Sequence, residues 1–153
     1  MLVTGLIALA ALTAATGAVC AARRMVAVVA VDGPSMEPAL AAGDKVLVRR
    51  AKVSGIRPGQ IVVFERPSPD GAWAARPPRW LADRREWMIK RVAAVPGDPV
   101  PDGLSAVGIA GQRVPDGKLV VLGDNSARSH DSRALGYIPA ERLLGVMVRP
   151  VAH

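Results

Sequence analysis

The chain has 153 residues, enough for one domain with a hydrophobic core, and a formal net charge of +7. That charge suits an anionic membrane surface or a nucleic acid, but the sequence shows no recognition helix, zinc module or aromatic stacking platform, so we expect no nucleic-acid partner. Cys20 is the only cysteine, and His130 and His153 are the only histidines, which excludes an intrachain disulfide and a cysteine- or histidine-rich metal site. We expect no metal and no cofactor, so any chemistry must use Ser, Lys, Asp, Glu or Arg side chains.

The beginning of the chain predicts a membrane anchor. Residues 1–22 carry no charged side chain, two arginines follow them, and about 20 apolar residues are enough to cross a bilayer as a helix. A cleaved signal peptide fits less well, because no Lys or Arg precedes the apolar run and the run is long for one. The residues before Cys20 are a poor lead-in to a lipidated cysteine. We therefore expect residues 1–24 to form one transmembrane helix and residues 25–153 to form one folded domain.

The rest of the chain predicts β structure. Short apolar runs alternate with turns rich in Gly, Pro and Asp, and a single helical turn is expected at 139–142. The expected strands are 26–31, 45–48, 61–64, 87–95, 119–122 and 144–148. This pattern predicts a mainly β domain, an antiparallel barrel or two-sheet structure.

Residues 65–87 interrupt the strand pattern with several prolines, arginines and tryptophans. This composition is typical of a mobile surface loop. Trp and Arg side chains also favour the headgroup region of a bilayer, so a loop that contacts the membrane is the alternative.

The stretch 31–50 presents a hydroxyl group close to a strand end. A turn at 32–34 precedes Ser35 and Met36, and Pro38 disfavours helical geometry in the residue before it. A second turn then leads into an alternating run of strand character. Ser35 is therefore a candidate nucleophile, provided that a base lies near it.

One candidate base is His130, in the sequence Ser129-His130-Asp131. These three residues look like a catalytic triad, but successive side chains of an extended segment point to opposite faces and cannot line up with one another. His130 could still serve Ser35 from elsewhere in the fold, with Asp131 or Asp124 orienting its ring.

The stronger candidate base is Lys90. A two-residue period places its side chain on the same face of a strand as Met88 and Val92. Apolar surroundings disfavour the charged ammonium and lower its pKa from about 10.4, which leaves a useful neutral fraction. The alternative is an edge-strand lysine whose stem packs while its ammonium stays in water.

A polar segment, 122–137, follows an apolar strand and is rich in turn-forming residues. Asp131 and Arg133 lie two residues apart and could form an ion pair. The hydroxyl of Ser129 could hydrogen-bond to the Lys90 amine and orient it.

Four motifs, in this order and after an apolar anchor, resemble those of the type I signal peptidase family, which are membrane-anchored Ser/Lys proteases that remove signal peptides. The motifs are GPSMEPAL at 33–40, GDKVLV at 43–48, KRVAAVPGD at 90–98 and GDNSARSHDSR at 123–133. The resemblance covers most of residues 31–137 and implies a signal-peptidase-like β domain.

The resemblance also implies roles for the matching residues. Ser35 would be the nucleophile, Lys90 its general base, and Ser129 the residue that orients Lys90. Three charged residues would hold the shape of the site: Asp124, Asp131 and Arg133. Met36 is expected to contact the substrate. The implied partners are membrane lipid and precursor proteins, which the family cleaves after small residues, typically Ala at the first and third positions before the bond.

The chain departs from the family pattern at several positions. Gly33 replaces a residue whose hydroxyl stabilises the oxyanion in some members, so the second oxyanion donor is unassigned. Ala39 and Ala94 replace the usual Thr and Gly. The short interval between Lys90 and Gly123 implies that the extra β-domain of larger members is reduced or missing. A compact member could be a maturation protease dedicated to one precursor, such as a pilin, conjugation or metalloenzyme precursor.

Two further interpretations come from other functional classes. Self-cleaving SOS repressors share a Ser/Lys dyad and a related β-fold, but they carry a DNA-binding helical domain where this chain has an apolar span. A catalytically inactive module that binds signal peptides would not need both Ser35 and Lys90.

Arg23 and Arg24 favour a cytoplasmic location for the residues after them, whereas a signal peptidase needs its catalytic domain outside the cytoplasm. The sequence leaves this conflict open.

Overall fold

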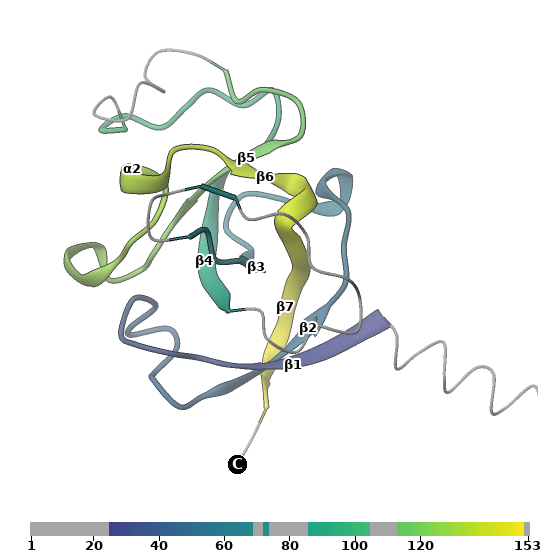
Figure 1. Cartoon of the computed structure of the whole chain (residues 1–153), viewed down its shortest axis with the longest axis vertical. Coiled ribbons are helices and arrows are strands. Elements are labelled where there is room, and N and C mark those ends of the chain that lie inside the picture. Colours follow the sequence, from purple (N-terminus) through teal and green to yellow (C-terminus); the bar gives the residue numbers. More distant parts are fainter. Residues whose placement is uncertain (1–24, 69–71, 74–85, 105–112, 152–153) are drawn as a thin grey trace, which may run out of the picture.

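The computed structural model describes residues 25–68, 72–73, 86–104 and 113–151 (Figure 1). The predicted anchor at 1–24 and most of the predicted loop at 65–87 lie outside these ranges. Within the described ranges, no helix has the length and apolar character needed to cross a membrane.

Seven strands form one antiparallel sheet in the order β1-β2-β7-β3-β4-β5-β6. The strands are β1 (Val26–Ala30), β2 (Lys45–Arg49), β3 (Ile61–Glu65), β4 (Trp87–Ala94), β5 (Lys118–Leu122), β6 (Ile138–Pro139) and β7 (Leu143–Val151). The described residues also include four short helical segments: η1 (Val53–Gly55), η4 (Ser126–Arg128), α2 (Ser132–Leu135) and η5 (Ala140–Arg142). The predicted mainly β, antiparallel fold is therefore confirmed.

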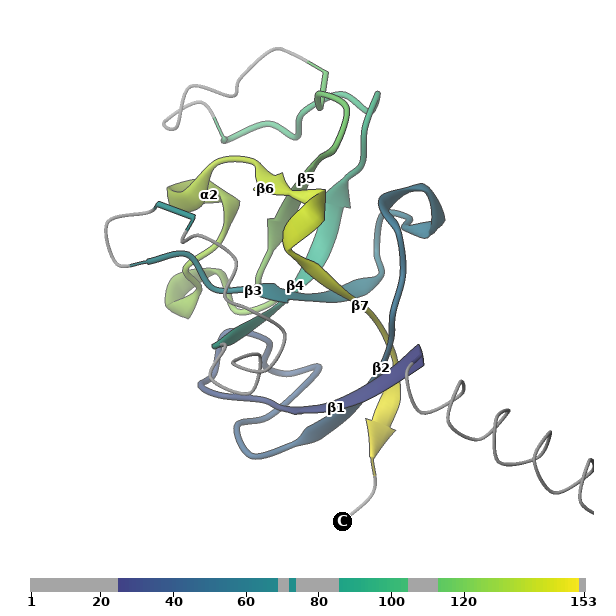
Figure 2. The same ribbon diagram turned by 45° about the vertical axis from the view of Figure 1, so that its right-hand side comes forward.

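The sheet curls around its long last strand. The first part of β7 pairs with β3 and its second part pairs with β2, so β1 and β2 turn across the lower end of the sheet in Figures 1 and 2. The pairing register shifts in three places, between β2 and β7, between β3 and β7, and between β4 and β5. Such irregularities bend a strand and increase its twist, which lets one sheet enclose its own core.

Strand β3 is buried on both faces. Its alternate residues contribute to two separate apolar clusters, with Val63 in the first and Val62 and Phe64 in the second. Strand β4 lies between β3 and β5, so Lys90 belongs to an interior strand. This placement contradicts the alternative that Lys90 sits on an exposed edge.

The six predicted strands are present with small changes in their ends, but some elements were not predicted. The two-residue strand β6 is too short to give a sequence pattern. The expectation of a single helical turn was wrong: η5 falls there, but α2, η1 and η4 also occur. Helix α2 begins where the side chain of Asp131 accepts a hydrogen bond from the backbone N–H of Arg133. This helix cap was not predicted because the surrounding segment is rich in turn-forming residues.

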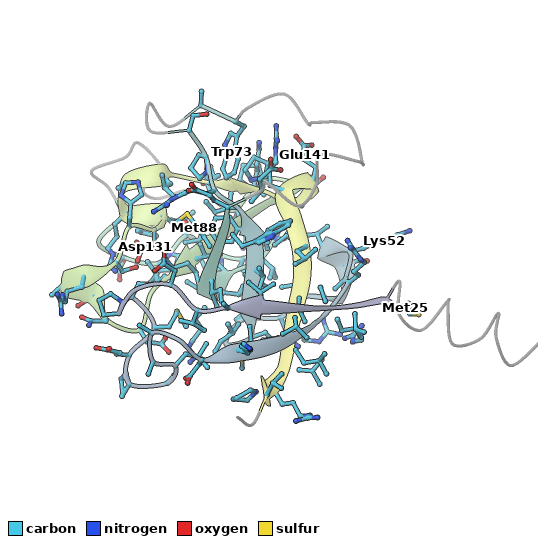
Figure 3. All side chains as sticks on the ribbon, turned by 60° about the horizontal axis from the view of Figure 1, so that its bottom comes forward. Met25, Lys52, Trp73, Met88, Asp131 and Glu141 are labelled. Atoms are coloured by element: carbon cyan, nitrogen blue, oxygen red, sulfur yellow. The ribbon has the colours of Figure 1, made fainter. Side chains whose placement is uncertain are left out.

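The described residues of the segment between β3 and β4 contact one another and the body of the domain. The backbone N–H of Arg66 donates to the carbonyl of Glu86 at 2.9 Å. The Arg142 guanidinium lies 5.6 Å from the ring centre of Trp73 and contacts the buried Glu65 carboxylate at 3.3 Å. Trp73 lies close to η5 and Glu141 in Figure 3. At this position the segment packs on the protein through a cation–π contact.

Candidate active site

Ser35 lies in the loop that joins β1 to β2. The base of this loop is closed by two backbone hydrogen bonds, from Val31 to the Asp44 carbonyl at 2.7 Å and from Gly43 to the Val31 carbonyl at 2.9 Å. Gly43 has a φ of +93°, a conformation that favours glycine. Met36 and Leu40 are each 1% exposed and anchor the loop in the core. The loop thus presents Ser35 as a half-buried residue between β1 and β2, as the turns in the sequence predict.

Lys90 reaches Ser35 from the middle of β4. Its amine donates to the Ser35 hydroxyl at 2.8 Å and to the carbonyl of Ile89 at 3.0 Å. Lys90 is 4% exposed, and its predicted neighbours Met88 and Val92 are buried as well. The structure thus brings together the two residues that the sequence selected as nucleophile and base.

The surroundings of Lys90 weaken its hold on a proton. Burial lowers the pKa of the Lys90 amine from its ordinary 10.5 to about 8, the negative charge of Asp131 opposes this shift, and the positive charge of Arg66 adds to it. At pH 7 about a tenth of the Lys90 side chains would then be neutral, against fewer than one in a thousand for a free lysine. A neutral amine at this distance can accept the Ser35 proton.

Asp131 is a buried carboxylate that connects the strands of the site to α2. It is 0% exposed and accepts hydrogen bonds from the backbone of Gly123 at 2.8 Å and from the hydroxyl of Ser129 at 2.6 Å. The Arg133 guanidinium forms the expected ion pair, at 2.9 and 2.6 Å to the two oxygens. Burial alone would raise the pKa of Asp131, but these hydrogen bonds, chiefly from Arg133, lower it to about 2. Asp131 is therefore charged at every ordinary pH.

Ser129 was expected to orient Lys90. Its hydroxyl proton points to Asp131, and among the described residues its hydroxyl makes no hydrogen bond to the Lys90 amine. Ser129 also packs against Gly123: a Cβ on Gly123 would collide with the Ser129 hydroxyl and lie 2.6 Å from the carbonyl oxygen of Ser35. The sequence motif contains this glycine, but only the structure shows that its hydrogen atom makes the close approach possible.

The loop after β5 is docked directly on the loop between β1 and β2 that carries Ser35. The backbone N–H of Asn125 donates to the Ser35 carbonyl at 3.0 Å. Asp124, expected to hold the shape of the site, receives two hydrogen bonds from Arg91 at 2.8 and 2.6 Å. Arg91 also donates to the carbonyl of Gly59 at 2.8 Å. Neither Asn125 nor Arg91 could be given a role from the sequence, because their partners are distant in the chain.

A cleft opens beside Ser35 and Lys90. Its lining comprises residues 31–36, Arg66, 87–90, Arg128 and His130. Met36, expected to contact substrate, lines this cleft although nearly all of its side chain is in the core.

His130 is exposed at the cleft, and neither of its proposed carboxylate partners is available to it. Asp131 is bound by Arg133, Ser129 and Gly123, and Asp124 is bound by Arg91. Within the described part of the chain, the geometry therefore favours Lys90 over His130 as the partner of Ser35.

A buried lysine beside a serine hydroxyl, on a curled antiparallel sheet, indicates a hydrolase-like site. The family model for "Signal peptidase, peptidase S26" matches residues 4–112 and 101–152. The chain belongs to this family, which confirms the resemblance inferred from its four motifs.

Curated relatives bear the same name. The chain is 30% identical over 135 residues to "Probable signal peptidase I-2" of Synechocystis sp., and this match covers 75% of the chain and 58% of that protein. It is 30% identical over 139 residues to "Probable signal peptidase I-1" of the same organism, with 75% and 65% covered. It is 26% identical over 153 residues to "Signal peptidase IB" of Staphylococcus aureus, with 75% and 72% covered. The chain thus spans less than two thirds of the length of the two Synechocystis proteins.

Proposed function

We propose that this protein is a membrane-bound serine endopeptidase that removes signal peptides from exported precursor proteins, with Ser35 as nucleophile and Lys90 as general base. The observation that carries this proposal is the 2.8 Å contact between the Lys90 amine and the Ser35 hydroxyl, at a lysine that is 4% exposed. Membership of the signal peptidase family and the names of the relatives supply the substrate class.

Acylation begins when neutral Lys90 takes the proton of the Ser35 hydroxyl as the oxygen attacks the carbonyl carbon of the scissile peptide bond. The tetrahedral intermediate collapses, the carbon–nitrogen bond breaks, and Lys90 gives its proton to the departing amine. The mature protein leaves with a new amino terminus, and the signal peptide stays on Ser35 as an ester.

Deacylation uses the same two residues. Water attacks the ester carbon while Lys90 accepts one of its protons. Lys90 then returns this proton to the Ser35 oxygen as the ester bond breaks. The signal peptide is released as a carboxylic acid, which loses the second proton of the water to solvent, and the free Ser35 hydroxyl is restored, so no cofactor is consumed.

The backbone N–H of Ser35 is the first candidate for binding the oxyanion. Among the described residues it donates no hydrogen bond, so it is free to stabilise negative charge that develops on the attacked carbonyl. Gly33 has a φ of +77° and brings no hydroxyl to this position. The second donor to the oxyanion is therefore not a side chain at position 33. A backbone N–H is the candidate for this role.

Ion pairs and hydrogen bonds around Ser35 and Lys90 support the proposed catalytic role, because they hold these two residues in position. Asp131 ties the Gly123 turn to α2, and Asn125 of the same loop holds the carbonyl of Ser35. Arg91 and Asp124 tie β4 to that loop. Catalytic groups held by several hydrogen bonds keep the short distance that proton transfer requires.

For location, we propose that residues 1–24 anchor the enzyme in the membrane and that the catalytic domain faces outward, where precursors emerge. A reporter enzyme fused after His153 tests this orientation. A reporter that is active only outside the cytoplasm agrees with it, and one that is active only in the cytoplasm contradicts it.

A narrower candidate is a maturation protease of the same family for a single precursor. The short connection between β4 and β5 favours it, because the described parts of this connection, closed by a bridge between Pro99 and Arg113, leave little chain for an additional domain. Cleavage of several unrelated precursors at comparable rates would contradict this narrower function.

The proposal is tested by cleavage of a signal-peptide substrate by the detergent-solubilised full chain. We expect Ser35→Ala and Lys90→Ala to abolish cleavage and His130→Ala to keep most of it. If Lys90→Ala retains full activity, the dyad is wrong. If only Ser35→Ala and His130→Ala are inactive, histidine is the base. If the wild type binds the peptide without cleaving it, the protein is a binding module.

A further inference from the structure

The cleft beside Ser35 is bordered mainly by positive charge. Arg66 and Arg128 line it in addition to the buried Lys90, and Asp32 is the only acidic residue among the described residues of the lining. The two arginines come from different parts of the fold, one just after β3 and the other at the end of η4. The cleft therefore combines a reacting pair with a cationic border.

Arg128 carries a charge that the described residues leave uncompensated. Its side chain is exposed and makes no hydrogen bond or ion pair within the described ranges. Its backbone N–H donates to the carbonyl of Asn125 at 3.1 Å, and Asn125 in turn holds the Ser35 carbonyl. Arg128 thus sits on the segment that is docked to the nucleophile loop.

Arg66 carries a partly compensated charge. Its guanidinium pairs with Glu86 at 2.8 Å, but the two side chains are 54% and 72% exposed. Exposed ion pairs of this kind are weak and leave the arginine free to interact with another anion. The charge of Arg66 also reaches the dyad, since it adds to the lowering of the pKa of Lys90.

We propose that Arg66 and Arg128 form a subsite for an acidic side chain, Asp or Glu, that flanks the scissile bond of the precursor. This inference rests on the proposed proteolytic function. A peptide bound near Ser35 must pass along the border of the cleft, and a carboxylate there gains attraction from both guanidinium groups. A lysine at the same place is repelled by them. Charge of this kind selects among precursors that are otherwise acceptable.

An anionic lipid headgroup could occupy the same arginines. We favour the peptide because both arginines line the cleft that holds Ser35 and Lys90, where the substrate must be during the reaction. The experiment is therefore done in a non-ionic detergent, and vesicles of anionic phospholipid are added only in a separate arm.

The test uses the full chain and peptides that share one cleavable sequence. Each peptide carries Asp, Asn or Lys at one of three positions on either side of the bond. Cleavage by the wild type gives the ratio of kcat/KM between the Asp and Asn peptides, and binding to Ser35→Ala gives the matching ratio of Kd values. At one or more positions we expect Asp to be favoured over Asn by about two- to fivefold, as for an exposed ion pair. The preference should shrink as salt is added.

Three variants and a control show which residues cause the preference for Asp over Asn. Arg128→Gln should bring the Asp/Asn ratio close to one, and Arg66→Gln should lower it by less. Glu86→Gln should raise the ratio, because it releases Arg66 from its partner. Arg57→Gln should leave it unchanged, since Arg57 is exposed and does not line the cleft.

A ratio of one at every position overturns the subsite, as does a preference that survives both arginine variants. Binding to Ser35→Ala decides this question even if the wild type cleaves nothing, so failure of the proposed function is distinguished from failure of the subsite. If vesicles accelerate all peptides equally, and Arg128→Gln removes this acceleration while the Asp/Asn ratio stays at one, the arginines bind lipid and the proposal is wrong.

Discussion

Lys90 and Arg91 are neighbouring cations on β4 with opposite surroundings. Arg91 makes two hydrogen bonds to the carboxylate of Asp124 and a third to the carbonyl of Gly59, and its pKa is raised mainly by the hydrogen bonding to Asp124. Lys90 is buried and makes no ion pair within the described residues, where its amine donates hydrogen bonds to the Ser35 hydroxyl and the Ile89 carbonyl. One cation is kept charged and the other is pushed towards neutrality.

The two cations differ because Asp124 binds Arg91 directly, whereas the nearby Asp131 does not bind Lys90. Asp131 is near enough to Lys90 to oppose the lowering of its pKa, but its oxygens are bound by Arg133, Ser129 and Gly123. Its charge is therefore felt by Lys90 without a direct ion pair, which would hold the lysine proton firmly. Asp131 and Asp124 bind other groups near this site, and among the described residues neither forms an ion pair with Lys90.

The greatest loss of activity should come from replacing Lys90 by arginine, and it is compared with the replacement of Arg91 by lysine. Lys90→Arg should lower kcat/KM by about 10²–10⁴, because a guanidinium stays protonated and cannot act as a base. Arg91→Lys keeps the charge but loses the two-pronged contact with Asp124, and its kcat/KM should fall by less than about tenfold. Steady-state cleavage of one signal-peptide substrate measures both. Equal losses in the two variants would mean that Lys90 acts through structure and not as a base.

The next test removes the buried carboxylate. Asp131→Asn should lower the free energy of unfolding at pH 7 by about 2–3 kcal/mol, less than for a fully buried pair because Arg133 is 36% exposed. Denaturant unfolding measures this loss, with the exposed Asp102→Asn as a matched control that should change stability little.

The same variant has a defined pH dependence. The pKa of Asp131 is about 2 in the folded protein, below its value in the unfolded chain. Its stabilising contribution is therefore complete above pH 4 and is lost as the pH falls from about 4 towards 2. Wild-type stability should decline across this window, and the decline should be smaller in Asp131→Asn. An identical decline in both proteins would show that other groups cause it.

Much of this organisation is readable in the sequence. Alternating apolar runs predict six of the seven strands, because a strand buried on one or both faces leaves a clear pattern. The same alternation places Lys90 with Met88 and Val92, and the structure buries all three. The Asp131–Arg133 ion pair could be predicted because its two members are close in the chain.

What the sequence does not show depends on contacts between distant segments. Arg91 meets Asp124 only because β4 pairs with β5, and Trp73 meets Arg142 only because η5 packs beside the segment after β3. The Ser129 hydroxyl was expected to bind the Lys90 amine, but in the fold it donates to Asp131, which lies two residues further along the chain. Helix α2 and strand β6 are too short for periodicity to reveal.

The pH dependence of cleavage should show a modest shift when the charges around Lys90 are changed. For the wild type, kcat/KM should rise with pH to a plateau with a midpoint near pH 8, because the pKa of Lys90 is about 8 and its neutral form is the proposed base. Arg66→Gln removes a positive charge that lowers this pKa, so the midpoint should move to higher pH. Asp131→Asn removes a negative charge that raises it, so the midpoint should move to lower pH.

These opposite shifts distinguish an electrostatic effect from a general loss of structure. A damaged site would lower the plateau without displacing the midpoint, whereas a change in the field at Lys90 displaces the midpoint in the direction set by the sign of the charge removed. The exposed Arg57→Gln, which does not line the cleft, should leave the midpoint in place. If Arg66→Gln and Asp131→Asn move the midpoint in the same direction, the titrating group is not Lys90, and the contrast between the two cations of β4 does not explain the activity.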